Sequence, residues 1–279
     1  MMRSNARRFE ADHAARLPQT ADGSVVGAED IVRHADTRRA ALLVHGFNDT
    51  PQSMAYLAGA LHRAGWTVHV PRLPGHGVSL RRMAREARYG AWTASVEQTY
   101  QQLRATHDVV VVCGQSMGGA LATLLAAQHH EIPALVLLAP YLRMPRRIEL
   151  QTLLAWLFRP LGEYRAGRGG DRSIHDPAAK SLALGPRVIT ARMMTELRTT
   201  ARRAYAALPQ LRSPTLYVQS REDNRITSHT AEDCFARIGS TQKVQRWVTG
   251  SGHIISADYC KDDIAEQVIA WFSEACALR

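Results

Sequence analysis

Lysine and aromatic side chains are scarce in this 279-residue sequence. Lys180, Lys243 and Lys261 are its only lysines, and Phe, Trp and Tyr together make up 6% of the chain. Arginines spread along the sequence therefore carry almost all of the formal net charge of +10 at pH 7. Proteins that bind nucleic acid more often cluster basic residues on one element, with aromatic residues among them. The pattern predicts a solvated basic surface with no nucleic-acid partner, or alternatively one that attracts an anionic membrane or anionic substrates.

Paired cysteines and long apolar segments are also missing. The longest apolar run, residues 132–142, is too short to cross a bilayer, and residues 1–23 contain no apolar segment of a secretion signal. Cysteines without C-x-x-C pairs or metal-ligand spacing fit a reducing compartment and imply no metal. The chain has four of them, Cys113, Cys234, Cys260 and Cys276. We therefore expect a soluble cytoplasmic protein that uses no metal and no organic cofactor.

Short apolar runs alternate with helical patterns from residue 40 onward. Runs of this kind are typical of parallel strands that are covered on both faces. Predicted strands span residues 40–45, 67–71, 109–113, 134–138, 215–219 and 244–248. Predicted helices span residues 52–64, 91–106, 117–129 and 261–277. Strands alternating with helices predict an α/β fold with a mostly parallel, doubly wound sheet.

One long stretch interrupts this alternation and divides the chain. Residues 141–208 show no strand pattern but contain an apolar helix at 150–158, a Gly/Arg-rich loop at 167–172 and further helix at 193–207. We interpret this stretch as a helical cap inserted over one end of the sheet. The predicted organisation is an N-terminal arm followed by a core in two parts around the insert. The boundaries are 1–30, 31–140, 141–208 and 209–279.

The sequence from 109 to 128, VVVVCGQSMGGALATLLAAQ, joins a strand to a helix through a G-x-S-x-G pattern. A sharp strand-to-helix elbow forces its central residue into a strained conformation, and the residues two positions away must then be small. Gly114 and Gly118 meet that requirement around Ser116. The elbow predicts an exposed serine hydroxyl beside a helix N-terminus, where developing negative charge is favoured.

A serine hydroxyl needs a base, and in this arrangement an acid and then a histidine follow it along the chain. Asp223 comes just after the predicted strand 215–219, and His253 comes after the strand 244–248. Open α/β sheets place their sites at these strand ends. Glu222 is an alternative acid, whereas His175 is interpreted as a turn residue of the insert. We expect Asp223 to orient His253 and His253 to accept the proton of Ser116.

Two backbone N–H groups are needed to stabilise an oxyanion. Met117 follows the nucleophile and supplies the first. The loop after the strand 40–45 supplies the second, and we select the N–H of Phe47 because Gly46 lets the backbone approach closely. His45 is expected to order this loop by hydrogen bonding.

Together these motifs resemble the α/β-hydrolase superfamily, and within it the bacterial carboxylesterases and monoacylglycerol lipases. The segments that carry the resemblance are LLVHGFNDTPQSM, LPGHG, GQSMGGALA, the Asp223 loop and GSGH, in that order. The resemblance extends from residue 40 to the C-terminus and implies a cap that shapes an acyl pocket. It also implies the triad Ser116, Asp223 and His253. Gln115 replaces the histidine of many relatives, which is expected to alter the polarity of the acyl site.

The predicted function is hydrolysis of a small-molecule or lipid-like carboxylic ester through an acyl-enzyme. Apolar cap residues are expected to line the substrate pocket, although simple packing of the cap explains them equally well. They are Leu153, Leu154, Leu157 and Phe158. A serine peptidase, a thioesterase and an acyltransferase are alternatives with the same triad, and a non-catalytic binding protein is a further one. The sequence does not predict an oligomeric state.

Overall fold

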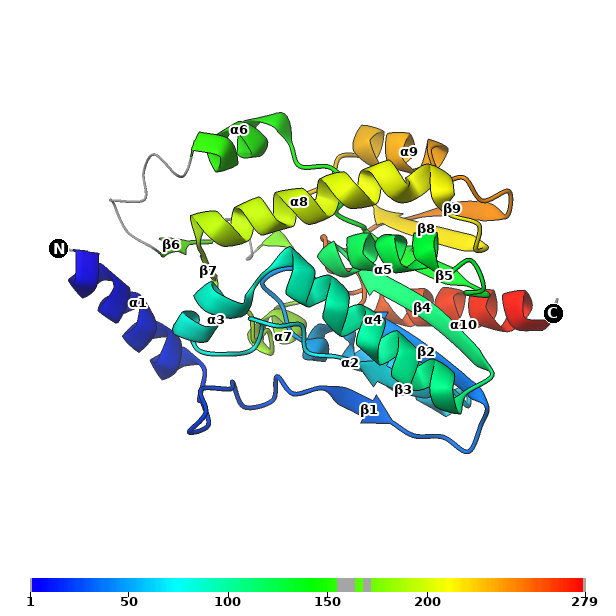
Figure 1. Ribbon diagram of the computed structural model, residues 1–279, viewed down its shortest axis with the longest axis horizontal. Coiled ribbons are helices and arrows are strands. Elements are labelled where there is room, and N and C mark those ends of the chain that lie inside the picture. The colour runs from blue at the N-terminus through cyan, green and yellow to red at the C-terminus, as the bar shows by residue number, and fades with distance from the viewer. Residues whose placement is uncertain (1, 155–163, 168–171, 278–279) are drawn as a thin grey trace.

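A seven-stranded sheet forms the centre of the molecule in the computed structural model, which describes residues 2–154, 164–167 and 172–277 (Figure 1). The strands run in the order β1-β3-β2-β4-β5-β8-β9. Every pair is parallel except β1 and β3. The strands are β1 (Ile31–Arg33), β2 (Arg39–Val44), β3 (Thr67–Val70), β4 (Val109–Gln115), β5 (Leu135–Leu138), β8 (Thr215–Ser220) and β9 (Lys243–Val248).

Helices cover both faces of this sheet, and they divide the core in two. The first core cluster includes side chains of α4 (Tyr89–Thr106), α5 (Met117–Gln128) and α8 (Ala191–Ala207). The second includes side chains of α2 (Ala55–Arg63) and α10 (Lys261–Ala277). Successive residues of β4 alternate between the clusters, since Val110 and Val112 belong to the first and Val111 and Cys113 to the second. Burial on both faces explains why the central strands β2, β4 and β5 are largely apolar.

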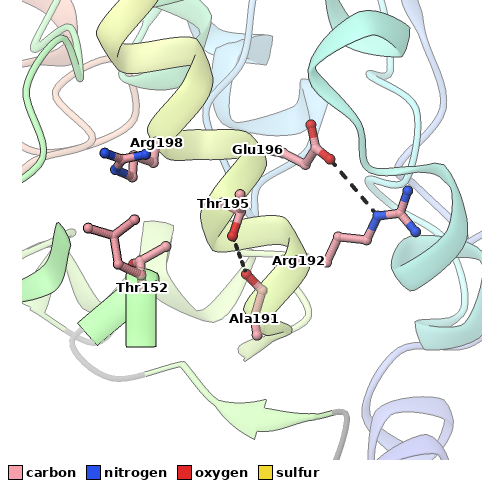
Figure 2. Close-up of a pocket in the computed structure, with 7 residues that line it drawn as sticks. Thr152, Ala191, Arg192, Thr195, Glu196 and Arg198 are labelled. Carbon is pink, nitrogen blue, oxygen red and sulfur yellow. Dashed lines mark hydrogen bonds and ion pairs between the residues drawn. The ribbon is translucent and has the colours of Figure 1, made fainter. Parts of the chain in front are cut away.

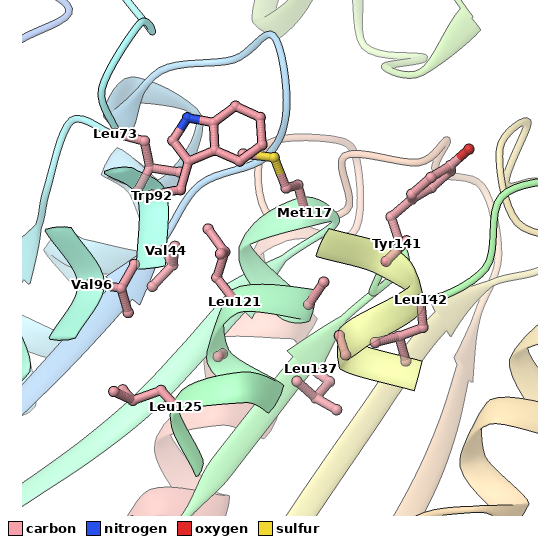
Figure 3. Close-up of a cluster of buried hydrophobic side chains, with 14 of the residues drawn as sticks. Val44, Leu73, Trp92, Val96, Met117, Leu121, Leu125, Leu137, Tyr141 and Leu142 are labelled. Atoms are coloured by element: carbon pink, nitrogen blue, oxygen red, sulfur yellow. The ribbon is translucent and has the colours of Figure 1, made fainter. Parts of the chain in front are cut away.

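Helix α5 occupies the middle of the first cluster (Figure 3). Its Leu121 and Leu125 belong to this cluster, and Met117 at the start of the helix points toward Trp92 of α4 (Figure 3). Gly118 and its small neighbours let the helix approach the strands closely. The N-terminus of α5 is thereby fixed at the carboxyl end of β4.

The predicted mostly parallel α/β sheet is confirmed, and all six predicted strands are present with ends that differ by one or two residues. The prediction missed β1, whose three residues are too few for a periodic pattern. The predicted helix 261–277 coincides with α10, whereas the helix predicted at 52–64 begins as a 3-10 turn, η1 (Pro51–Met54), before α2. The structure also has α3 (Leu80–Glu86) and α9 (Ser228–Ala236), which were not predicted.

The expectation of no strand in residues 141–208 was wrong. Two-residue strands β6 (Arg165–Ala166) and β7 (Val188–Ile189) pair antiparallel there. Such short strands leave no pattern in the sequence. The described helices of this stretch are α6 (Arg146–Leu154), α7 (Pro177–Ser181) and α8, with the 3-10 turn η4 (Leu208–Gln210) at its end. Helix α8 packs against α5 and belongs to the core.

The N-terminal arm forms a helix, α1 (Met2–Arg16), at one end of the molecule (Figure 1). It lies against α3, where Arg81 Nη2 is 2.9 Å from Glu10 Oε2. The buried ring of His13 donates a hydrogen bond to the Val78 carbonyl. In the part of the chain that the structure describes, no helix has the length and apolar character needed to span a bilayer.

Candidate active site

Ser116 lies at the corner between β4 and α5 with a backbone conformation that non-glycine residues rarely adopt. Its φ is 55° and its ψ is −117°. A Cβ at Gly114 would lie 2.2 Å from the Gly118 carbonyl oxygen, and a Cβ at Gly118 would lie 2.0 Å from the Val44 carbonyl oxygen. Both positions therefore require glycine, and the strained elbow that the sequence predicted at Ser116 is present.

The structure brings Asp223 to this corner from the loop after β8, and His253 from the loop after β9. Ser116 Oγ lies 2.8 Å from His253 Nε2, and His253 Nδ1 lies 2.7 Å from Asp223 Oδ2. The side chain of His253 is 7% exposed and that of Asp223 is fully buried. The three residues thus form one hydrogen-bonded chain that ends at the half-buried serine hydroxyl.

Asp223 is held as an anion, and this fixes the direction of the hydrogen bonds. Burial by itself would raise the pKa of Asp223, but the charge and hydrogen bond of His253 and two backbone N–H groups lower it below the ordinary value. Those N–H groups belong to Arg225 and Ile226 and lie 2.6 and 3.0 Å from Oδ1. An ionised carboxylate only accepts hydrogen bonds. His253 therefore donates from Nδ1, and its Nε2 is the acceptor for the serine proton.

The alternative acid has a different partner. Glu222 Oε2 accepts a hydrogen bond from the backbone N–H of Gly250 at 3.0 Å. The carboxylate that reaches His253 is that of Asp223. His175 lies near the same loop, since its Nδ1 donates to the Gly250 carbonyl at 3.3 Å.

The loop of residues 45–50 lies against the elbow, since a Cβ at Gly46 would lie 3.3 Å from Ser116 Cβ. His45 is fully buried; its Nε2 accepts from the Leu73 N–H at 3.1 Å and its Nδ1 donates to the Gly46 carbonyl at 2.9 Å. Burial lowers the pKa of His45 to about 3, so its ring stays neutral and orders the loop, as expected. Among the described residues, the N–H of Phe47 has no hydrogen-bond acceptor. The N–H of Met117 opens α5, where main-chain donors lack partners within the helix.

Asp49 is a buried carboxyl group in this loop that the sequence did not bring to notice. Its Oδ1 accepts from the Thr50 N–H at 2.8 Å, and its Oδ2 has no partner of normal geometry among the described residues. Burial raises the pKa of Asp49 to about 6, although Ser53 and His253 favour the ionised form. No three His, Cys, Asp or Glu side chains in the described ranges are grouped to hold a metal ion.

Two buried glutamines support Asp223 and His253 by hydrogen bonds. Gln219 Nε2 donates to Asp223 Oδ2 at 2.7 Å. Gln115 Nε2 donates to the carbonyls of Leu138 and His253 at 3.2 and 3.0 Å. Since Gln115 is fully buried, it ties the elbow to the backbone of the base, a role that its sequence position alone did not indicate. A polar residue inside an otherwise apolar strand was the available signal.

The predicted pocket residues lie on or beyond α6. Leu153 and Leu154 are 47% and 42% exposed, whereas Leu157 and Phe158 lie outside the described residues. Leu153 borders a surface pocket between α6 and α8, together with Thr152, Ala191, Arg192, Thr195, Glu196 and Arg198 (Figure 2). Contact of these leucines with substrate stays a prediction.

Comparison with known proteins identifies relatives along most of the chain. The model of the family described as serine aminopeptidase, S33 matches residues 35–259. A thermostable monoacylglycerol lipase of Bacillus sp. (strain H-257) is 34% identical over 235 residues, which are 84% of this chain and 90% of that relative. A carboxylesterase of Bacillus subtilis (strain 168) is 24% identical over 231 residues, covering 82% of this chain and 90% of the relative.

A solved structure agrees with these relatives. It is described as one of two metagenome-derived lipolytic enzymes, and it superimposes with a TM-score of 0.82 at 32% identity. The match covers 90% of this chain and 99% of that one. The sheet with its flanking helices, the family match and these relatives lead to one conclusion: the chain belongs to the serine aminopeptidase S33 family and is a hydrolase with the α/β-hydrolase fold.

Proposed function

We propose that this enzyme hydrolyses carboxylic esters through the triad Ser116, His253 and Asp223. The observation that carries the proposal is the position of His253 between the other two, within 2.8 Å of the Ser116 hydroxyl and 2.7 Å of the Asp223 carboxylate. Its relatives named as a monoacylglycerol lipase and a carboxylesterase support ester hydrolysis.

In the proposed reaction, Ser116 Oγ attacks the acyl carbon while its proton passes to His253 Nε2. The carbonyl π electrons move to the oxygen, and the resulting tetrahedral intermediate collapses to an acyl-enzyme as His253 protonates the leaving alcohol. Water then attacks the acyl carbon and gives a proton to His253, and the second tetrahedral intermediate breaks its bond to Ser116 Oγ, which takes that proton back from His253 as the acid leaves. Asp223 stabilises the imidazolium in both halves.

The N–H groups of Phe47 and Met117 are proposed to bind the oxyanion. Met117 follows Ser116 at the elbow, and the residue before Phe47 lies close to it, since a Cβ at Gly46 would lie 3.3 Å from Ser116 Cβ. Donors that are fixed before reaction can lower the barrier by about 3–4 kcal/mol each, which is why their rigid support matters. His45 and the glycines of the elbow supply that support.

Residues 141–208 are proposed to act as a cap over the acyl site, with α8 as its packed base. The proposed substrates are lipid-like esters, supported by the name of the monoacylglycerol lipase relative. We propose that Leu153, Leu154, Leu157 and Phe158 contact the acyl chain, and that the basic surface allows contact with an anionic membrane.

Peptidase, thioesterase and acyltransferase activities share this chemistry. The description of the matched family as serine aminopeptidase keeps peptides as a second substrate class. A solved thioesterase domain from a biosynthetic pathway is 17% identical and shares only the fold.

The proposal is tested by hydrolysis of p-nitrophenyl esters from acetate to palmitate. The proteins compared are wild type, Ser116→Ala and the control Ser273→Ala, whose residue is exposed. We expect Ser116→Ala to lose activity at every chain length and Ser273→Ala to keep it. Equal activity of Ser116→Ala and wild type would refute the triad. If no ester is cleaved but a fluorophosphonate labels Ser116, the same machinery acts on peptides or thioesters.

A further inference from the structure

Residues 173–176 belong to the insert and lie against loops of the core, and we call them the cap-return segment. They lie against the loops of both proposed triad partners. Ser173 Oγ contacts Asn224 Oδ1 at 3.2 Å and Arg225 Nε at 3.3 Å. The Ser173 carbonyl accepts a hydrogen bond from the Ile254 N–H at 2.9 Å. The segment thus touches the residues that follow Asp223 and the residue that follows His253.

The side chain of Asp258 makes a second connection between the cap-return segment and the loop of His253. Its Oδ2 accepts from the N–H groups of His175 at 2.8 Å and Gly252 at 2.7 Å. Its Oδ1 accepts from the N–H groups of Asp176 at 2.8 Å and Tyr259 at 2.9 Å. One fully buried carboxylate therefore collects donors from the cap-return segment, from the residue before His253 and from its own neighbour Tyr259.

The charge state of Asp258 suits this role. Burial by itself would raise its pKa, but the four backbone donors outweigh that effect and hold its pKa below the ordinary value. Hydrogen bonds to an ionised acceptor are roughly twice as strong as neutral ones. Each oxygen of Asp258 accepts two N–H groups. An asparagine here would replace one oxygen by an NH2 group, which cannot accept, so in either orientation two of the four donors would face another donor.

We propose that Asp258 is a positioning residue that fixes the loop of His253 to the cap-return segment, so that the base is in place only while that segment is docked. The inference rests on the proposed function, because it gives His253 its role. His253 is flanked on both sides by these ties: Gly252 through Asp258, and Ile254 through the Ser173 carbonyl. Release of the segment therefore frees the backbone on either side of the imidazole.

The test uses Asp258→Asn in the full chain, with Asp30→Asn as the matched control. Asp30 also accepts a backbone N–H, that of Arg72 at 3.0 Å, but it lies at the far edge of the sheet beside β1. We expect kcat for p-nitrophenyl butyrate to fall about 100-fold in Asp258→Asn, the loss that a 1 Å misplacement can cause, with KM within about twofold. Asp30→Asn should keep both within about twofold of wild type.

A second variant perturbs the same contact from the other side. A Cβ at Gly252 would lie 2.7 Å from the Ser173 carbonyl oxygen, so Gly252→Ala should push the cap-return segment away. Residues acting through one contact give non-additive effects, and we expect the double variant with Asp258→Asn to lose little more kcat than the worse single variant. If Asp258→Asn does not fold, Gly252→Ala carries the test alone.

Hydrogen exchange of peptides covering 173–176 and 252–254 provides a measurement that needs no activity. Faster exchange in both peptides of Asp258→Asn, with the rest of the chain unchanged, supports the tie. Unchanged exchange, or a folded Asp258→Asn with wild-type kcat, overturns it, as does strictly additive loss in the double variant. If wild type cleaves no ester and a fluorophosphonate does not label Ser116, the proposed function fails, and the exchange result still decides whether the tie exists.

Discussion

The buried carboxyl of Asp49 gives the sharpest prediction for stability against pH. The residue is 8% exposed, and burial raises its pKa from 3.8 to about 6. In the unfolded chain the group returns to its ordinary value. The folded protein therefore binds this proton more tightly than the unfolded chain does. The stability that the protonated Asp49 carboxyl contributes is fully present below pH 3.8 and is lost as the pH rises through about 6.

The substitution Asp49→Asn removes this titration while keeping an oxygen for the Thr50 N–H. Each unit of pKa difference corresponds to about 1.4 kcal/mol, so the shift of roughly two units is worth about 3 kcal/mol. From pH 4 to pH 8, the unfolding free energy of Asp49→Asn should therefore improve by about 3 kcal/mol relative to wild type. The prediction concerns only how the difference in unfolding free energy between the two proteins changes with pH. The absolute stability of either protein is therefore not needed.

Urea unfolding of both proteins at pH 4, 5, 6, 7 and 8 measures this difference. The control Asp30→Asn should show almost no trend in this range, because a hydrogen bond from His69 lowers the pKa of Asp30 below its ordinary value of 3.8. Its carboxyl is then ionised in both the folded and the unfolded protein above about pH 5, so its contribution to stability changes only at lower pH. If the curves of wild type and Asp49→Asn run parallel within about 0.5 kcal/mol, a typical surface effect, then Asp49 titrates normally and the reasoning is refuted.

Two further predictions concern the elbow. Gly118→Ala should destabilise the protein by about 3 kcal/mol or more, because its Cβ would lie 2.0 Å from the Val44 carbonyl oxygen. The control Gly90→Ala, whose Cβ meets open space in α4, should be neutral or stabilising. Thermal unfolding compares the two variants, and equal melting temperatures would contradict the packing argument. Gln115→Leu should lower kcat and reduce the free energy of unfolding by about 1–3 kcal/mol, because it leaves the buried carbonyl of His253 without its donor. Gln128→Leu, at the exposed end of α5, should change neither quantity. Ester kinetics and urea unfolding measure both, and an unchanged kcat in Gln115→Leu would count against the tie to His253.

Local rules in the sequence determined the sheet and the elbow. Apolar runs predicted six strands because most of them are buried on both faces, and β1 escaped because three residues carry no period. Ser116 could be found because its constraint is local: the glycines two positions away are required by the strained turn itself. The position of Asp223 and His253 after their strands followed from a general rule of parallel sheets, which is why those residues could be named before their distances were known.

Only the tertiary structure decided what supports the site. Asp258 lies about 80 residues along the chain from the cap-return segment it binds, and no spacing rule relates the two. Asp49 and Gln115 are polar residues whose role depends on burial, and burial is set by what packs against them from elsewhere in the chain. Glu222 and Asp223 are neighbours in sequence, and the direction in which each side chain leaves the loop after β8 selected the partner of His253. The sequence by itself determined the strands, the elbow and the residues proposed to react, while long-range packing determined which buried polar groups hold those residues in place.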